Sequence, residues 1–155
     1  MKKTLLAIPV YNCEKQILRV LDSIKKYKYK FNEIIFIENN SSDNTLKNII
    51  NYTKANNFEN TSIFQNENNI NLGGSHINIF NHFLNSNNDQ LLVMHGDDQG
   101  DIEDYISIEN PTEDFSWIKF SRFHPNSKLI GYSNLKKIGN QVFNLLFSIV
   151  LKKRI

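Results

Sequence analysis

The feature that most constrains the fold is a repeated alternation between short apolar runs and segments with helical periodicity. Each apolar run ends in a polar loop, and apolar residues then recur at helical spacing before the next run begins. The runs expected to form strands are residues 4–10, 33–37, 61–65 and 91–94. Strands that alternate with helices usually pair in parallel, because each helix carries the chain back across the sheet. We therefore predict an α/β fold with a mostly parallel sheet and helices on both faces.

The carboxyl-terminal part of the chain has a looser pattern. We expect a short helix at 101–108, a strand at 115–120 and a C-terminal amphipathic helix at 132–155, whose apolar residues recur at helical spacing over 135–151. The long helix has a wide apolar face and lysines near both ends. Three fates are open for this face: it covers the sheet, it lies on a membrane surface, or it drives dimerisation.

Length and composition narrow the class of protein. A chain of 155 residues suits one domain, which we expect to span 1–155. The net charge is only +2, and basic and aromatic residues do not interleave, so nucleic acid is not an expected partner. A single cysteine, Cys13, excludes an internal disulfide and fits a reducing compartment. No apolar run reaches the roughly 20 residues of a membrane span. We therefore expect a cytoplasmic protein that contacts a membrane, if at all, at its periphery.

Polar loops follow three of the predicted strands. They cover residues 9–12, 38–45 and 95–101. Right-handed crossovers place the carboxyl ends of parallel strands at the same edge of the sheet, where open α/β sheets bind their ligands. The convergence of these loops is the strongest indication of a binding site.

A nucleotide is one ligand that suits such loops. It needs an acceptor for the N–H edge of its base, a wall for the ring, and positive charge near its phosphates. We expect Glu38 or Asn39 to accept from the base, and the backbone around Pro9 and Tyr11 to form the wall.

The loop HGDDQGD at 95–101 indicates a metal site. Carboxylate and amide oxygens suit hard cations such as Mg²⁺ or Mn²⁺, which commonly hold the phosphates of a nucleotide. We expect Asp97 and Gln99 to be the ligands, whereas Asp98 should face solvent. Three roles stay open for His95: a metal ligand, a hydrogen-bond donor to a ligand residue, or a buried hydrogen-bonded residue.

Several motifs in order resemble glycosyltransferase family 2, whose members have a GT-A fold, a Rossmann-like nucleotide-binding architecture, and use nucleotide-sugar donors. These motifs are IPVYN, FIENNSSDNT, NLGGSHIN, VMHGDDQGD and FSRF. The fourth motif is most similar to the branch that contains polyprenyl-phosphate (dolichol-phosphate) sugar synthases, in which a glutamine follows two places after the last aspartate of the motif.

The resemblance assigns nucleotide contacts to the first two motifs. It implies that Pro9, Tyr11 and Glu14 border the base and ribose, and that Glu38 and Asn39 contact the base. The donor would be linked to UDP or GDP.

The resemblance also implies a catalytic and metal-binding set. Asp97 takes the position of the principal ligand of Mg²⁺ or Mn²⁺, with Gln99 and His95 beside it. Arg122, in FSRF, would face the phosphates of the donor or of a lipid-phosphate acceptor. Asp97 and Arg122 are therefore the expected catalytic residues of an inverting sugar transfer.

The sequence departs from the family pattern at three places. His95 stands where many members carry an aspartate, and Asn39 with Asn40 replaces the usual aspartate and glycine. Family members also continue into a second half that carries acceptor-binding residues. We therefore expect residues 1–155 to correspond to the donor-binding half, truncated after it, and the activity of this chain alone stays open.

Other functions fit parts of the same pattern. A non-catalytic nucleotide-binding remnant or interaction module would keep the fold and lose the chemistry. A nucleotidyltransferase is a second alternative, although no glycine-rich basic loop follows the first strand. A dinucleotide-binding oxidoreductase is disfavoured, because the first loop, PVYNCEK, lacks closely spaced glycines.

Overall fold

The computed structural model describes residues 2–107, 118 and 133–152. The chain divides into two compact units, residues 1–110 and 111–155, and each is described by itself. The expectation of one domain over 1–155 stays a prediction.

The first unit contains every strand among the described residues. Its elements are β1 (Thr4–Val10), α1 (Ile17–Tyr27), the 3₁₀ turn η1 (Lys28–Lys30), β2 (Glu33–Glu38), α2 (Thr45–Ala55), β3 (Thr61–Gln65), α3 (Asn71–Leu84), β4 (Gln90–Val93) and α4 (Ile102–Ile106). The strands lie within a residue or two of the predicted runs, and the predicted short helix corresponds to α4.

The four strands form one parallel sheet in the order β3-β2-β1-β4. In the register of the sheet, Ala7 of β1 pairs with both Ile35 and Val93. β1 and β2 are almost wholly buried, whereas β3 and β4 form the half-exposed edges. The predicted α/β fold with a parallel sheet is confirmed.

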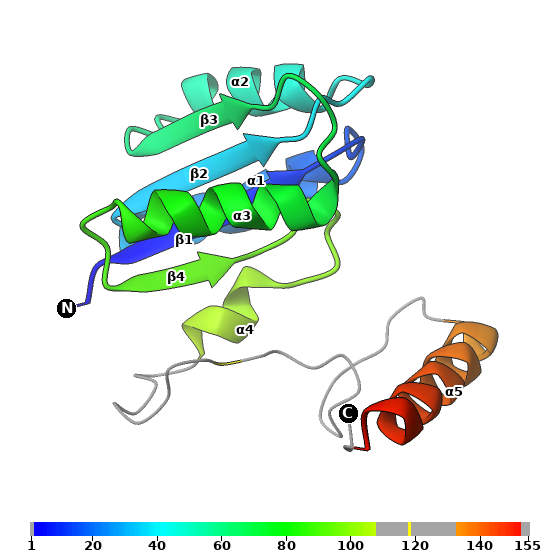
Figure 1. Ribbon diagram of the computed structural model, residues 1–155. Helices are drawn as coiled ribbons and strands as arrows, with labels where there is room; N and C mark the ends of the chain where they lie inside the picture. Colours follow the sequence, from blue (N-terminus) through cyan, green and yellow to red (C-terminus); the bar gives the residue numbers. More distant parts are fainter. Residues whose placement is uncertain (1, 108–117, 119–132, 153–155) are drawn as a thin grey trace. The chain divides into compact units, whose positions relative to one another are not determined.

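Side chains alternate between the two faces of the sheet, and each face packs against helices. Leu6 and Ile8 of β1 belong to the larger core, together with apolar residues of α1, α2 and α4. Leu5 and Ala7 belong to a smaller core that includes Ile79 of α3. Figure 1 shows the arrangement, with α3 across one face of the sheet and α1 and α2 on the other. Helices cover both faces, as predicted.

Two helices begin elsewhere than the sequence pattern indicated. The apolar spacing of residues 14–27 predicts a helix that starts at Glu14, but α1 begins at Ile17, and the Glu14 N–H donates to Asp43 Oδ2 at 3.0 Å in a neighbouring loop. The pair Gly73 and Gly74 predicts the start of the next helix, but α3 begins at Asn71, so both glycines lie inside it. A Cβ at Gly74 would come within 2.8 Å of the Ile70 side chain, and a glycine is therefore needed there.

The second unit contributes one described helix, α5 (Asn134–Leu151), where the sequence predicted 135–151. Its apolar side chains are exposed all along the helix, and the rings of Phe143 and Phe147 lie 5.0 Å apart. Among the described residues, no helix is both long enough and apolar enough to cross a membrane. The strand predicted at 115–120 lies outside the described residues, except for Ile118.

Two isoleucines of α3 provide a matched test of this packing. Ile79 is fully buried against the sheet, whereas Ile77 on the same helix is 60% exposed. We expect Ile79→Ala to lower the free energy of unfolding by about 2–5 kcal/mol, because it leaves a cavity. Ile77→Ala should change it by less than about 0.5 kcal/mol. Urea denaturation of both variants measures the difference, and equal losses would contradict the placement of α3.

Candidate functional site

The loops that follow β1, β2 and β4 meet at the carboxyl edge of the sheet. The Asn39 N–H donates to the Val10 carbonyl at 3.0 Å, and the Gly96 N–H donates to the Pro9 carbonyl at 3.2 Å. The end of β1 thus holds both neighbouring loops. We call the assembly of residues 9–16, 38–45 and 94–101 the rim.

The first two loops of the rim interlock through their side chains. Asn12 accepts from the Ser42 N–H through Oδ1 at 2.9 Å, and its own N–H donates to Ser41 Oγ at 3.0 Å. The Cys13 N–H donates to Thr45 Oγ1 at 2.8 Å. Asn12 and Asn40 adopt positive φ angles of 46° and 59°, which asparagine tolerates better than most residues. These contacts fix the backbone that borders the predicted nucleotide site.

Glu14 and Asp43 fasten the same two loops at the start of α2. Glu14 Oε2 accepts from the Asn44 N–H at 3.1 Å. Asp43 accepts from the Thr45 N–H at 2.9 Å and from the Glu14 N–H at 3.0 Å. Burial raises the pKa of Asp43, but hydrogen bonds from Thr45 and from the backbone outweigh it, so the pKa lies below its ordinary value of 3.8. The position of Ser42 and Asp43 before the helical pattern predicts that one of them is the N-cap of α2, but the N-cap is Asn44, and Asp43 instead accepts from the Thr45 N–H one residue further on.

Glu38, at the end of β2, is fully buried. Its Oε1 accepts from the Ser41 N–H at 2.7 Å. Its Oε2 is also buried and has no hydrogen-bond partner among the described residues. An unpaired buried carboxylate oxygen is costly, and a donor placed beside it would be strongly favoured.

The neighbouring Asn39 has its side-chain amide engaged within the protein. Its Oδ1 accepts from Asn66 Nδ2 and from the Ile70 N–H, both at 3.0 Å. Its Nδ2 donates to Asn69 Oδ1 at 2.7 Å. Asn39 therefore holds the turn that leads into α3, a role that the sequence did not indicate.

Pro9 and Tyr11 lie where β1 ends. Pro9 is buried in the strand, opposite Ile37 of β2. Tyr11 is 49% exposed at the rim, so its ring is available to a ligand. This placement agrees with a wall formed by the first loop.

The third loop carries the predicted metal ligands. His95 is half-buried, Asp97 is partly exposed, and Gln99 is exposed with its N–H donating to Asp97 Oδ1 at 3.2 Å. Asp98 instead pairs with Arg19 of α1 at 2.6 Å, in agreement with its predicted surface role. Among the described residues, no group of three or more His, Cys, Asp or Glu side chains is placed to hold a metal ion.

His95 is kept neutral by its surroundings. Burial lowers its pKa below 6.5, the Asp97 carboxylate opposes this effect, and His76 adds to it. The His76 ring, on α3, lies 5.6 Å from the His95 ring. The sequence pattern indicates no more than a packing or surface role for His76, and only the packing of α3 brings it close to His95.

Cys13 is buried between the first two loops. Burial is the main reason why the pKa of its thiol is raised, so the thiol is protonated at neutral pH. A buried, protonated thiol is typical of a packing role.

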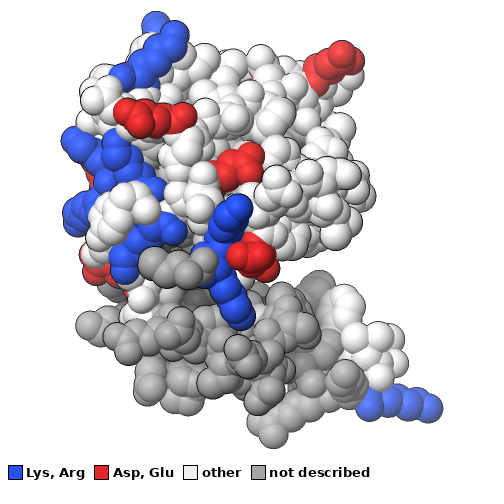
Figure 2. All heavy atoms as spheres, turned by 90° about the vertical axis from the view of Figure 1, so that its left-hand side faces the viewer, with Lys and Arg blue, Asp and Glu red and all other residues white. Residues whose placement is uncertain are grey.

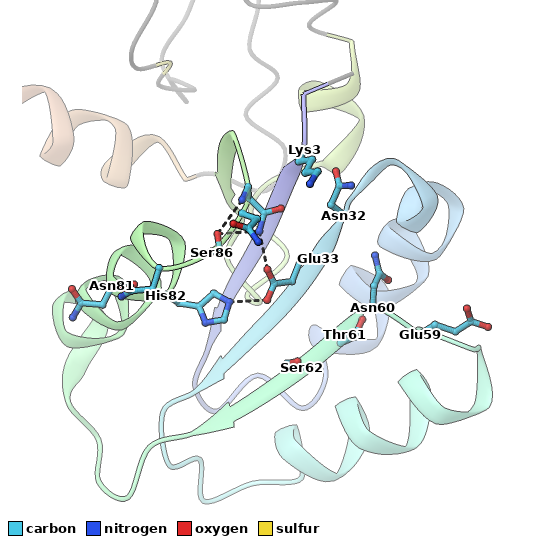
Figure 3. A pocket seen from close by; sticks show the side chains of 13 residues that line it. Lys3, Asn32, Glu33, Glu59, Asn60, Thr61, Ser62, Asn81, His82 and Ser86 are labelled. Carbon is cyan, nitrogen blue, oxygen red and sulfur yellow. Dashed lines mark hydrogen bonds and ion pairs between the residues drawn. The ribbon is translucent and has the colours of Figure 1, made fainter.

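A hollow lies at the opposite, amino edge of the sheet, with a volume of about 940 Å³. The Glu33 carboxylate lies in its wall and accepts from Asn88 at 2.8 Å while pairing with His82 at 2.7 Å (Figure 3). Figure 2 looks onto this edge and shows basic side chains gathered on one side of a largely uncharged surface. Lysines close α1 and occupy η1 at this end of the sheet.

Comparison with known proteins identifies the family. Residues 6–111 match the sequence model of "Glycosyl transferase family 2". The chain belongs to this family. The predicted family is therefore confirmed, whereas the polyprenyl-phosphate branch stays a prediction.

Solved structures agree with the fold. The crystal structure of S. aureus TarS is 28% identical to this chain, with a TM-score of 0.50. The match covers 61% of this chain and 16% of TarS. The mannosyltransferase PcManGT from Pyrobaculum calidifontis, in complex with GDP-Man and Mn²⁺, is 15% identical with a TM-score of 0.53, over 62% of this chain and 28% of the other. The latter likeness shows the fold alone. The chain spans less than a third of either neighbour, and no curated protein matches it.

Arg122 is a predicted site residue that lies outside the described residues, and its role stays a prediction. Glu14, Glu38, Asn39, Asp97 and the other predicted residues all lie at the rim.

Two glycines of the third loop test how tightly the rim is packed. A Cβ at Gly96 would lie 2.5 Å from Val10 Cγ1 and 3.4 Å from Cys13 Sγ, whereas nothing lies within 4 Å of one at Gly100. We expect Gly96→Ala to destabilise the fold by about 1–3 kcal/mol through overpacking. Gly100→Ala should be nearly neutral. Thermal unfolding compares the two, and a neutral Gly96→Ala would show that the loop is loosely packed.

The lowered pKa of Asp43 gives a pH-dependent prediction. A carboxyl whose pKa is lower in the folded state stabilises the fold above its ordinary value of 3.8, and this stabilisation is lost as the pH falls through the folded-state value. We expect Asp43→Asn to cost about 1–2 kcal/mol at pH 7 and much less near pH 3. Urea denaturation at both pH values checks this. Glu59→Gln is the control, because this exposed carboxylate has no hydrogen-bond or ion-pair partner among the described residues, and it should show neither effect.

Proposed function

We propose that the first unit binds the nucleotide part of a UDP- or GDP-linked sugar, together with Mg²⁺ or Mn²⁺, for an inverting glycosyl transfer. The observation that carries this proposal is the family match over 6–111, which contains the whole rim. PcManGT, which shares the fold, was solved with GDP-Man and Mn²⁺, and this supports a donor of the same class.

The base is proposed to pair with Glu38. Uracil and guanine both present N–H donors, and Glu38 Oε2 is an acceptor without a partner among the described residues. Because that oxygen is buried, the base reaches it only when a side chain of the surrounding loops moves aside. Asn39 then acts by holding the turn at 66–70, and it contacts the base only if this turn rearranges.

The ribose and the ring of the base are proposed to lie against the first loop. Tyr11 offers an exposed aromatic face, and Pro9 fixes the backbone beneath it. Glu14 keeps this loop joined to the start of α2 through Asn44. The border of the site is therefore held in place before any ligand arrives, which lowers the entropy lost on binding.

The third loop fits a metal ion that shares its ligands with the donor. Asp97 supplies a partly exposed carboxylate, His95 a neutral imidazole and Gln99 an amide oxygen. The described residues hold no preformed cluster of three such groups, which suits an ion that obtains its other ligands from the diphosphate. When bound, the ion would stabilise the negative charge on the leaving diphosphate.

The reaction itself would displace the nucleoside diphosphate from the anomeric carbon. An oxygen of the acceptor forms the new bond on the face opposite the leaving group, so the configuration inverts. Asp97 orients the phosphates, and Arg122 is proposed to pair with phosphate oxygens through its guanidinium group. A lipid-phosphate acceptor is already anionic and requires little help from a general base.

The acceptor is proposed to be a polyprenyl phosphate at a membrane surface. The second unit supports this, because α5 exposes a row of large apolar side chains and residues 133–155 contain five basic residues and no acidic residue. An apolar helix with basic flanks is typical of attachment to an anionic membrane surface. A cytoplasmic location with peripheral attachment follows from this proposal, and a homodimer through α5 is the competing use of the same face.

The second candidate is a nucleotide-binding protein without transferase activity. The observation in its favour is the neutral His95, which stands where many family members carry an aspartate. The family match favours both candidates over a nucleotidyltransferase.

Calorimetry with UDP and GDP, each with and without Mn²⁺, tests the proposal. We expect one nucleotide to bind, more tightly when Mn²⁺ is present. Glu38→Gln should weaken binding by at least about tenfold with or without the ion, because it replaces a carboxylate acceptor. Asp97→Asn should abolish only the increase in nucleotide affinity that Mn²⁺ provides. Absence of binding to either nucleotide would refute the proposal, provided that thermal unfolding shows a folded protein.

Sugar transfer separates the two candidates. A chain that binds nucleotide yet neither hydrolyses the donor nor transfers sugar to a polyprenyl phosphate is the non-catalytic protein. Glu59→Gln, at the far edge of the sheet, should leave nucleotide binding unchanged and serves as the matched control for Glu38→Gln.

A further inference from the structure

Two histidines from different elements face each other at the rim. His76 lies in α3 and His95 follows β4, and their ring centroids are 5.6 Å apart with an angle of 50° between the planes. Both side chains are partly buried and belong to the first unit. Neither a strand nor a helix brings them together alone, so the pair is a product of the tertiary fold.

The alternation of the strand explains the position of His95. Leu91 and Val93 pack with the smaller core on the α3 side of the sheet, whereas Met94 belongs to the larger core on the other side. Because strand side chains alternate, His95 continues the row that faces α3. On α3, Ser75 is buried toward the sheet, and His76 follows it.

A hydrogen bond sets the tautomer of His76. Its Nδ1 lies 3.0 Å from the Leu72 carbonyl oxygen, one turn earlier in α3. A carbonyl oxygen can only accept, so Nδ1 carries the hydrogen and Nε2 keeps its lone pair in the neutral ring. Histidines that bind metals commonly donate their other ring nitrogen to a backbone carbonyl in this way.

The separation of the rings matches that of two imidazoles on one ion. With a metal–nitrogen distance of about 2.0–2.1 Å, each ring centre lies roughly 3.2 Å from the metal, so two rings at a tetrahedral angle are about 5 Å apart, and about 6 Å at wider angles. The observed 5.6 Å falls within this range.

We propose that His76 and His95 form a two-imidazole site for a transition-metal ion such as Zn²⁺, Co²⁺ or Mn²⁺. The remaining positions on the ion would be taken by water, by the phosphates of a donor or, after a movement of the third loop, by Asp97, because the described residues hold no preformed group of three His, Cys, Asp or Glu side chains. Imidazole nitrogen suits these ions, whereas Mg²⁺ prefers oxygen ligands. His76 would therefore determine the metal specificity of the site, because it favours the binding of these ions over that of Mg²⁺. The inference rests on the proposed metal position at His95, but not on nucleotide binding.

Packing alone is the competing explanation of His76. Its ring also stacks on Phe80, with a centroid distance of 6.2 Å and an angle of 29°. A phenylalanine at position 76 would keep this stacking and remove both nitrogens. The variant His76→Phe therefore separates a ligand from a packing residue.

The test uses the full chain without an affinity tag and without nucleotide. Zn²⁺ and Mg²⁺ are titrated by calorimetry, and Co²⁺ by its visible absorption, which reports nitrogen ligation directly. We expect His76→Phe and His95→Gln each to weaken Zn²⁺ and Co²⁺ binding by at least about tenfold, with loss of the Co²⁺ absorption bands. Mg²⁺ binding should not respond to His76→Phe.

His82→Phe is the matched control. His82 lies on the same helix but pairs with Glu33 at the amino edge, so its replacement should leave Zn²⁺ and Co²⁺ binding within about twofold of the original. The proposal is overturned if the original chain binds neither ion, or if His76→Phe binds Zn²⁺ as tightly as the original. Since no nucleotide is present, these failures are distinct from a failure of the calorimetry with UDP and GDP.

Discussion

The structure depends on the pairing of β1 with a strand on each side. β1 donates and accepts backbone hydrogen bonds along both edges, and its side chains supply apolar surface to both cores. A central strand that helices cover on both faces must carry apolar side chains wherever it is buried, which in β1 is residues 5–10. The polar residues begin only at Tyr11, and the functional chemistry is thereby confined to the edge where the strand ends.

At the rim the strands end, so the backbone groups of the loops need hydrogen-bond partners from outside the sheet. Backbone N–H groups of the loops are satisfied by the side chains of Asn12, Asp43 and Glu14, each reaching across from one loop to another. Glu38 is the exception, since one oxygen of a buried carboxylate lacks a partner among the described residues. A protein keeps such a group at a cost in stability, unless a bound water, ion or ligand supplies the missing hydrogen bond.

The sequence predicted the elements of the sheet and the convergence of the loops well, because both follow from local periodicity and from the handedness of crossovers. It failed where long-range side-chain contacts decide the outcome. The Glu14 N–H donates to Asp43 in another loop, and the side chain of Asn39 accepts from Asn66 and from the Ile70 N–H. The approach of His76 to His95 also required the packing of α3, although the alternation of residues 91–95 already placed His95 on that face of the sheet. For the residues around Arg122, the family resemblance remains the only guide.

Asn39 gives the rim a closed arrangement. Its side chain joins the end of β2 to the turn before α3, and His76 of α3 lies beside His95 in the loop after β4. Gly96 of that loop donates to Pro9 of β1, and Asn12, after β1, accepts from Ser42 in the loop after β2. The contacts therefore form a circuit rather than a row. In a closed circuit each segment contacts two others. If one contact opens to admit a ligand, every segment therefore keeps its other contact and stays connected to the sheet. Redundancy of this kind allows a site to be both held in shape and locally deformable.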